Sequence, residues 1–256
     1  MLLWLPQAAS ESATTTTARR ASLIAANLSS APSGVCAGFR TGYAPRVPLP
    51  PWLDRVLYRH PFEGKSARRY ARKERPAFGD LDERLLDGMG PMLAGAHRLL
   101  DVGTGPATFA ARAAARHPAL TVLGLEPSRD FAQPRPGVRM VRAAGEALPL
   151  RDRSIDVAVC LSSIRHVRDR AATLRELRRV VHGTLVIVEL DPAADGARIA
   201  AHADHLGPLL RRAFGPLVVR TAPRAEAIAA IAHDAGWQLR FRRDDPVQPV
   251  YILELA

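Results

Sequence analysis

The 256-residue chain contains few cysteines, few lysines and few aromatic residues, and it has no long apolar run. Its two cysteines, Cys36 and Cys160, are too few for a disulfide framework or a cysteine-rich zinc site. No run of 18 or more apolar residues occurs, so we expect no membrane-spanning helix. No fixed period recurs, which excludes a coiled coil and a repeat array. These absences favour a cytoplasmic α/β protein, and we predict no metal site.

The positive charge is carried almost entirely by arginine. The chain has 36 Lys+Arg against 25 Asp+Glu, a net charge of +11, and Lys65 and Lys73 are the only lysines. Guanidinium groups bind carboxylates and phosphates well, so this balance permits an acidic partner such as nucleic acid. An actinobacterial-type, GC-rich coding bias explains the same composition, and we favour that explanation.

Residues 1–50 differ in composition from the rest of the chain. This segment is rich in Ser and Thr, closes with several prolines and contains a single acid, Glu11. We predict a disordered extension or an over-extended start, without an assigned function. Residues 51–256 are expected to form one domain that begins with a helical cap at 51–97. The helix predicted around Tyr70 is arginine-rich. It is either a solvated basic face, which we favour, or a cover whose Tyr70 reaches over a ligand.

From Arg98 onward, short apolar runs alternate with helical periods, as is typical of parallel βαβ units. Predicted strands cover residues 99–102, 120–125, 138–141, 155–161 and 184–190, and a final hairpin pairs 237–243 with 250–255. Predicted helices cover 81–93, 109–117, 171–181, 194–214 and 224–235. The pattern therefore predicts a doubly wound, Rossmann-like seven-stranded sheet with N-terminal helices and a C-terminal β-hairpin.

Two glycines and two acids follow the first strands of this sheet. Gly103 and Gly105 suit a loop that approaches a ligand closely, and Glu126 follows about 20 residues later, where an acid binds ribose hydroxyls. Thr108 stands where a dinucleotide fingerprint requires a third glycine. Asp101 would also repel a pyrophosphate, by about 4 kcal/mol at roughly 4 Å and a dielectric constant near 20. Acids instead stabilise the ammonium and sulfonium groups of S-adenosylmethionine, so charge favours that cofactor.

Four motifs in this order carry a family resemblance: Asp101–Gly105, Glu126–Ser128, Gly145–Leu150 and Ser154–Val159. Together they resemble the class I S-adenosylmethionine-dependent methyltransferases, and among them the ubiquinone/menaquinone-biosynthesis-like (type 11) small-molecule group. The likeness covers about residues 52–256.

The resemblance implies a cofactor site. Asp101, Gly103 and Gly105 would surround the methionine end of the cofactor, Glu126 would hold the ribose, and the backbone of Cys160 and Leu161 would meet the amino group. Tyr70 is included as a cofactor contact from the cover.

The chain departs from this family at the adenine subsite. Ala144 replaces the usual Asp that accepts from the adenine amine. Adenine would then rely on the Gly145 amide, on Glu146 or on stacking.

His166, just after the fourth strand, is the candidate catalytic residue. It stands where the family's His-rich loop reaches the pocket, and its ordinary pKa range suits a general base. The alternative is that it packs or caps this loop. Glu189 and Asp191 end the fifth strand and either orient a substrate hydroxyl or simply line the cleft.

The segment 191–220 is the expected substrate cover. Its apolar side would be formed by Leu206, Leu209, Leu210 and Phe214. His202 and His205 suggest metal ligands by their spacing, but an exposed polar helix face is the favoured interpretation.

Three functional hypotheses remain open. The first is methyl transfer to a small molecule, O-directed, on a glycan, natural product or quinone-like acceptor. Within it, residues 59–64 are similar to mycofactocin-associated oligosaccharide methyltransferases. The second is an RNA or DNA methyltransferase, although residues 161–163 replace the Asn/Asp-Pro-Pro-Tyr/Phe loop of such enzymes. The third is a non-catalytic protein that binds the cofactor. The sequence names neither the acceptor nor the oligomeric state.

Overall fold

The computed structural model describes residues 62–72, 78–203, 219 and 222–256, all within the unit Leu49–Ala256. The predicted extension 1–50, the start of the predicted helical cap at 51–61 and the predicted apolar side of the insert lie outside the described residues. No helix in the described part of the chain is long and apolar enough to cross a membrane.

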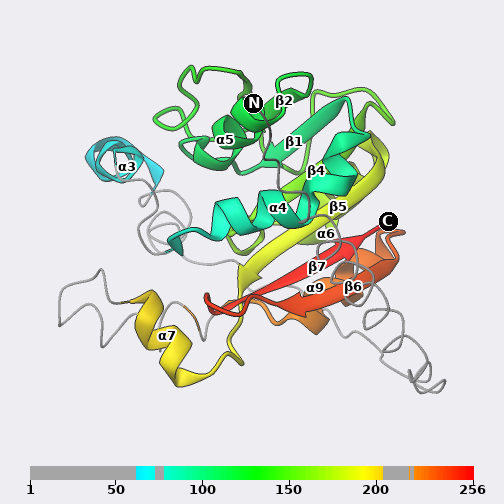
Figure 1. Cartoon of the computed structure of the whole chain (residues 1–256). Helices are drawn as coiled ribbons and strands as arrows, with labels where there is room; N and C mark the ends of the chain where they lie inside the picture. Colours follow the sequence, from blue (N-terminus) through cyan, green and yellow to red (C-terminus); the bar gives the residue numbers. More distant parts are fainter. Residues whose placement is uncertain (1–61, 73–77, 204–218, 220–221) are drawn as a thin grey trace, which may run out of the picture. The chain divides into compact units, whose positions relative to one another are not determined.

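A seven-stranded sheet organises the domain (Figure 1), in the order β3-β2-β1-β4-β5-β7-β6. The strands are β1 (Arg98–Val102), β2 (Thr121–Leu125), β3 (Val138–Val141), β4 (Ile155–Leu161), β5 (Val181–Leu190), β6 (Leu239–Asp244) and β7 (Val250–Leu255). The first five are parallel, and β7 runs antiparallel to β5 and β6. The predicted doubly wound sheet with its terminal hairpin is therefore confirmed.

Helices α4 (Leu81–Ala94) and α5 (Thr108–Arg116) cover one face of this sheet, and α6 (Arg170–Val180) and α9 (Ala225–Asp234) cover the other. The described residues also form α3 (Gly64–Ala71), α7 (Gly196–His202) and a short 3-10 turn, η4, at Ile164–His166. The strands extend toward the side where α3 and α7 lie (Figure 1). The strand order reverses between β1 and β4, because the chain builds the sheet outward from β1 to β3 on one side and from β4 on the other. Such sheets bind ligands at this position.

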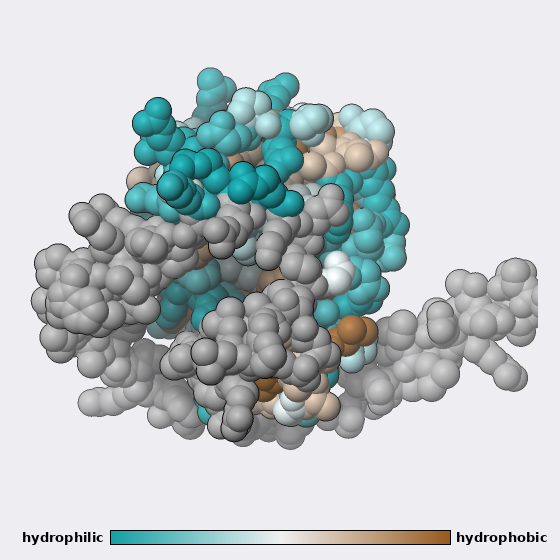
Figure 2. Space-filling view, turned by 90° about the vertical axis from the view of Figure 1, so that its left-hand side faces the viewer, coloured by the Kyte–Doolittle hydropathy of each residue, from teal (hydrophilic) through white to brown (hydrophobic). Residues whose placement is uncertain are grey.

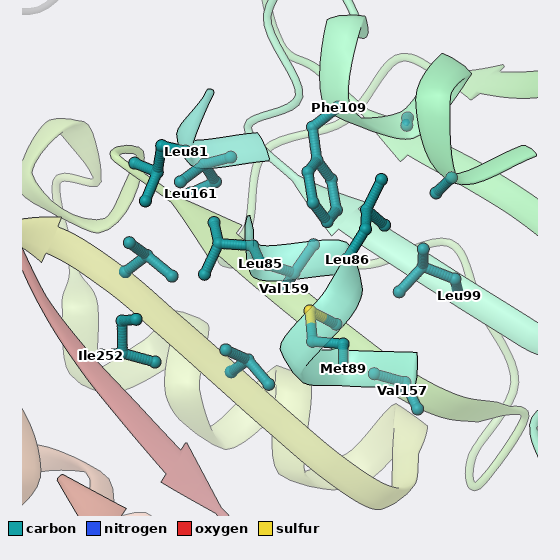
Figure 3. Close-up of a cluster of buried hydrophobic side chains, with 14 of the residues drawn as sticks. Leu81, Leu85, Leu86, Met89, Leu99, Phe109, Val157, Val159, Leu161 and Ile252 are labelled. Carbon is teal, nitrogen blue, oxygen red and sulfur yellow. The ribbon is translucent and has the colours of Figure 1, made fainter. Parts of the chain in front are cut away.

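Alternation along the strands divides the core into two clusters. In β4, Val157 and Val159 face α4 and α5, whereas Ala158 and Cys160 face α6 and α9. Figure 3 shows the first cluster, in which apolar side chains of α4 meet Leu99, Phe109 and Ile252. The predicted apolar stripe of α4 is buried as expected: Leu81, Leu85, Leu86, Met89 and Leu93.

Strand β5 begins three residues earlier than predicted, directly after α6. Gly183 makes this early pairing possible, because a Cβ there would lie 2.1 Å from the carbonyl oxygen of Asp156. Only a glycine lets β4 and β5 approach so closely.

Candidate functional site

The loop after β1 is held by its own main chain. The N–H groups of Gly103 and Thr104 donate to the Leu125 carbonyl at 2.8 and 3.0 Å. Gly103 and Gly105 have φ angles of 68° and 56°, in the left-handed region that favours glycine. A Cβ at Gly103 would also lie 2.6 Å from the Cβ of Ser163. The loop therefore passes close to the segment after β4, as a ligand-binding glycine loop requires.

Both predicted acids lie against this loop. Asp101, 2% exposed, accepts a hydrogen bond from the Thr104 hydroxyl at 2.5 Å. Glu126, 5% exposed, accepts from the Gly105 N–H at 2.8 Å and from the Ser128 N–H at 2.9 Å. The spacing of 21 residues between Gly105 and Glu126 thus brings these groups into contact.

The electrostatics of Glu126 fit a cationic ligand. Burial raises the pKa of its carboxyl, and the hydrogen bonds from Ser128 and Gly105 partly oppose that rise. Each carboxylate oxygen can accept a second hydrogen bond, so both ribose hydroxyls can be accommodated. A sulfonium close by would favour the ionised carboxylate. Asp101 and Glu126 therefore fit S-adenosylmethionine, which supplies an electrophilic methyl group when bound.

The predicted adenine residues connect the β3–β4 loop to α6. A Cβ at Gly145 would lie 2.7 Å from the Thr173 methyl group, so glycine is needed there for packing. The Glu146 carboxylate accepts from the Asp169 N–H at 3.2 Å. These contacts leave the Gly145 amide as the candidate adenine donor and give Glu146 a structural bond.

Cys160 and Leu161 end β4 and pair with β5, so their backbone stands at the carboxyl edge of the sheet. The Cys160 thiol is fully buried, and burial and the Asp101 charge raise its pKa. It packs as a small apolar side chain in the core. The next residue, Ser162, has a φ of 52°, and its buried hydroxyl has no hydrogen-bond partner. The chain therefore turns sharply as it leaves β4.

His166 lies on η4, directly after that turn. The Arg165 N–H donates to the buried Glu189 carboxylate at 3.2 Å. Arg170 donates to the carbonyls of Ile164 and Arg165 at 3.0 and 3.2 Å. Glu189 is 0% exposed and lies beneath η4, where it accepts the bond from the Arg165 N–H. It was expected to orient a substrate hydroxyl or to line the cleft, but its complete burial does not agree with either role.

The imidazole of His166 is neutral at physiological pH. Desolvation lowers its pKa to about 4, and the charges of Arg165 and Arg170 act in the same direction. Part of the residue is exposed to solvent, so water moderates this shift without changing its direction. His166 is therefore available to accept a proton or a hydrogen bond, but it is a weak base.

The segment from Phe62 to Arg72, which we term the N-terminal cover, packs against this turn and against the β2–β3 loop. The Phe62 ring meets His166 edge-on, with centroids 4.8 Å apart. Tyr70 is 43% exposed and lies 5.8 Å from the Phe131 ring. Figure 2 looks onto the side of α3 and α7, where hydrophilic residues predominate in the upper half of the described surface. Lys65, Arg68 and Arg72 of this segment are exposed, as expected for the favoured solvated basic face. The contact of Tyr70 with a ligand stays a prediction.

The favoured interpretation of His202 was wrong. The side chain is 2% exposed; its Nδ1 lies 2.7 Å from Gln248 Oε1, and its ring meets Phe78 edge-on. His202 was expected on an exposed helix face, but it is buried against the β6–β7 turn. The spacing of residues in the sequence does not reveal this contact. His205 lies outside the described residues. Among those described, no group of three His, Cys, Asp or Glu side chains could hold a metal ion.

A cleft of about 300 Å³ lies elsewhere, between α4 and the β6–β7 turn. Arg84, Leu85 and Arg243 contribute to its lining, but none of the predicted cofactor residues does. We therefore assign the chemistry to the carboxyl edge of β1, β2 and β4.

Sequence reasoning missed Phe62 as a neighbour of His166. Its partner is 104 positions away, so no local pattern shows the contact. Ser128 belonged to a recognised motif, and its short distance from Glu126 was the available signal for a role in the site.

Comparisons with known proteins agree with this geometry. The family model described as "Methyltransferase domain" matches residues 100–187, from β1 into β5. The chain is similar to a demethylmenaquinone methyltransferase from Roseiflexus castenholzii, with 32% identity over 160 residues, 55% of this chain and 67% of that protein.

Two solved structures share the fold. A SAM-dependent methyltransferase from Aquifex aeolicus has a TM-score of 0.58 at 15% identity, with 76% of this chain and 98% of that chain covered. The magnesium protoporphyrin IX methyltransferase from Synechocystis, solved with bound SAH, has a TM-score of 0.57 at 14% identity, with 78% and 98% covered.

The matched methyltransferase domain begins in β1, the strand that places Asp101 beside the glycine loop. The Roseiflexus relative is named for methyl transfer, and the solved structures share the fold of this chain. The chain therefore belongs to the class I S-adenosylmethionine-dependent methyltransferases.

Proposed function

We propose that this methyltransferase acts on a small, planar acceptor with an acidic ring hydroxyl, of the phenol or hydroquinone type. The observation that carries the proposal is the position of His166, at the carboxyl end of β4 and edge-on beneath Phe62 at 4.8 Å. Aromatic edges and faces bind planar rings favourably. The name of the Roseiflexus relative, a demethylmenaquinone methyltransferase, supports a quinone-like acceptor.

The weak basicity of His166 favours a phenolic hydroxyl over a sugar hydroxyl. Burial lowers the pKa of His166, and a weaker base requires a more acidic hydroxyl as its proton donor. A phenol has a pKa of about 10, as the tyrosine side chain does, and an alcohol is far less acidic. Removal of that proton makes the oxygen, or the ring carbon beside it, nucleophilic.

The remaining residues act on orientation and charge. Asp101, Gly103, Gly105 and Glu126 would hold the cofactor, with backbone groups at Gly145, Cys160 and Leu161 and with Tyr70 from the cover. Bound there, S-adenosylmethionine would supply the methyl group, and its sulfur would keep the electron pair of the broken bond. The hydroxyl proton passes to His166 and then to water.

An acceptor panel tests this proposal. The protein is incubated with S-adenosylmethionine and either a naphthohydroquinone, a simple phenol or an oligosaccharide, and S-adenosylhomocysteine formation is measured. We expect turnover with the ring hydroxyls and none with the oligosaccharide. Turnover with the oligosaccharide alone would reject the phenolic acceptor and support the glycan alternative suggested by residues 59–64.

A second experiment identifies the natural acceptor. Extracts of cells with and without the gene are compared by mass spectrometry, and the compound sought is one that lacks a methyl group when the gene is deleted. A nucleoside with that deficit would instead support the nucleic-acid alternative.

A further inference from the structure

Ser128 contacts both the cofactor-binding acid and the N-terminal cover. It is 5% exposed, and its N–H donates to Glu126 Oε1 at 2.9 Å. Its hydroxyl donates to the carbonyl oxygen of Phe62 and accepts from the Phe131 N–H at 3.4 Å. One buried residue therefore connects the carboxylate of Glu126 with the beginning of the cover.

The residues that follow Ser128 extend this connection. Asp130 accepts from the Gly64 N–H at 2.7 Å and from Arg68 Nη1 at 2.8 Å. The Phe131 ring lies 6.2 Å from the Phe62 ring, and Tyr70 also contacts it. Residues 128–131 thus form a platform on which the cover docks.

The N-terminal cover also contacts His166, the proposed base. Phe62, which accepts the hydrogen bond from Ser128, packs its ring against His166. Contacts therefore run from Glu126 through Ser128 and Phe62 to His166, on three separate segments of the chain.

We infer that Ser128 is a positioning residue that couples cofactor binding at Glu126 to docking of the N-terminal cover over His166. This inference rests on the proposed function. A ribose bound to Glu126 would restrain the carboxylate and, through it, the Ser128 main chain. The Ser128 hydroxyl is then held toward Phe62, and the cover docks more firmly. The acceptor site is completed after the cofactor has bound, which gives an ordered reaction.

The coupling is reciprocal, since each event stabilises the other by the same factor. A docked cover therefore tightens cofactor binding as much as the cofactor protects the cover. This equality distinguishes a coupling residue from a direct cofactor ligand, whose loss weakens binding without a matching change in the cover.

Hydrogen exchange of the full chain tests the inference, with S-adenosylhomocysteine as the probe. In the wild type we expect the probe to slow amide exchange in residues 62–71 by about fivefold or more. Ser128→Ala keeps the N–H that donates to Glu126 but removes the hydroxyl. We expect the Kd of this variant for the probe to rise by no more than about fivefold. The probe should slow amide exchange in its residues 62–71 by less than about twofold.

Two further variants serve as controls. Asp130→Ala weakens the platform without touching Ser128, so exchange in the cover should rise with and without the probe, and the ratio between the two should persist. Ser154→Ala removes an exposed hydroxyl that donates to the Arg151 carbonyl, before β4, and should change neither measurement.

The inference would be overturned if the probe slowed amide exchange in residues 62–71 of Ser128→Ala as much as in the wild type. A rise in Kd of more than about fiftyfold would also overturn it, because that would place Ser128 in the cofactor site itself. Wild-type protein that binds the probe without protecting the cover would reject the coupling alone. Wild-type protein that fails to bind the probe would contradict the proposed function.

Discussion

The loop after β1 and the turn after β4 lie at the same edge of the sheet, but different kinds of contact hold them. Main-chain N–H groups fix the first loop through Leu125 and Glu126, so its partners come from the neighbouring strand β2 and its end. The turn that carries His166 is held by side chains from three other segments: Phe62 in the cover, Arg170 in α6 and Glu189 in β5.

This difference separates two properties of the protein. In the proposed function, the loop after β1 with its two buried acids forms the cofactor half of the site, which should tolerate few changes. The turn after β4, shaped by side chains from distant segments, forms the acceptor half, where substitutions should alter the acceptor while the cofactor still binds. The following predictions test that separation.

The largest effect is expected for His166→Gln. This substitution removes the proposed proton acceptor from the turn after β4 and leaves the loop after β1, with Asp101 and Glu126, unchanged. We expect kcat to fall by about 10²–10⁴-fold, and the Kd for S-adenosylhomocysteine to stay within about twofold. Steady-state kinetics and calorimetry measure the two quantities. A loss of affinity for S-adenosylhomocysteine as large as the fall in kcat would show that His166 acts on cofactor binding as well as on the acceptor.

The pH dependence of the same variant gives a second readout. The pKa of His166 is lowered from 6.5 to about 4, so the folded protein resists protonation of this group. Its contribution to stability is present above pH 6.5 and is lost as the pH falls toward 4. Thermal unfolding should therefore show a smaller loss of stability over this window in His166→Gln than in the wild type. Identical pH curves would contradict the lowered pKa.

Gly103→Ala should damage both halves, because this glycine of the cofactor loop approaches Ser163 beside η4. A Cβ would add a clash at 2.6 Å to the left-handed penalty of about 1–2 kcal/mol. We expect a loss of at least about 2 kcal/mol in the free energy of unfolding, and weaker cofactor binding. Gly105→Ala is the matched control, since its Cβ would meet nothing within 4 Å and only the φ penalty applies. Equal losses in denaturant unfolding would reject the role of the Ser163 contact.

Glu126→Gln changes the acid of the cofactor half. Loss of charge-assisted bonds to ribose should weaken S-adenosylhomocysteine binding by about 10–100-fold. A Gln amide has one acceptor oxygen for the N–H groups of Gly105 and Ser128, so the free variant should also be less stable than the wild type. Burial raises the Glu126 pKa, so stability is fully present below the unfolded pKa and declines as the pH rises through the folded pKa. This decline should be absent from the variant. Calorimetry and thermal unfolding at several pH values provide both readouts, and an equal decline in the variant would contradict the raised pKa.

The smallest effect is expected for Thr173→Val, which tests whether the adenine subsite includes the Thr173 hydroxyl. The Thr173 hydroxyl is buried beside Gly145 without a hydrogen-bond partner. Its removal should stabilise the protein by about 1 kcal/mol and leave the Kd for S-adenosylhomocysteine unchanged. A weaker Kd would show that the cofactor uses this hydroxyl, and the adenine subsite would then extend into α6.

The sequence predicted the geometry of the loop after β1 better than that of the turn after β4. The contact of Gly105 with Glu126 could be expected because strand patterns and backbone requirements involve neighbouring residues. The early start of β5 was missed because it depends on the approach of Gly183 to Asp156 in another strand. His202 was misjudged because its burial depends on Phe78 and Gln248, which its own helix does not reveal.

By itself, the amino-acid sequence determined the alternation of strands and helices, the glycine loop with its acids, and the resemblance to one enzyme family. These features are encoded by periodicity and by the few residue types that a tight turn permits. Only the tertiary structure decided that Phe62 contacts His166, that Glu189 lies beneath the turn, and that Ser128 joins the two halves. Such contacts form when burial of apolar surface brings distant segments together, and their partners therefore leave no periodic trace in the chain.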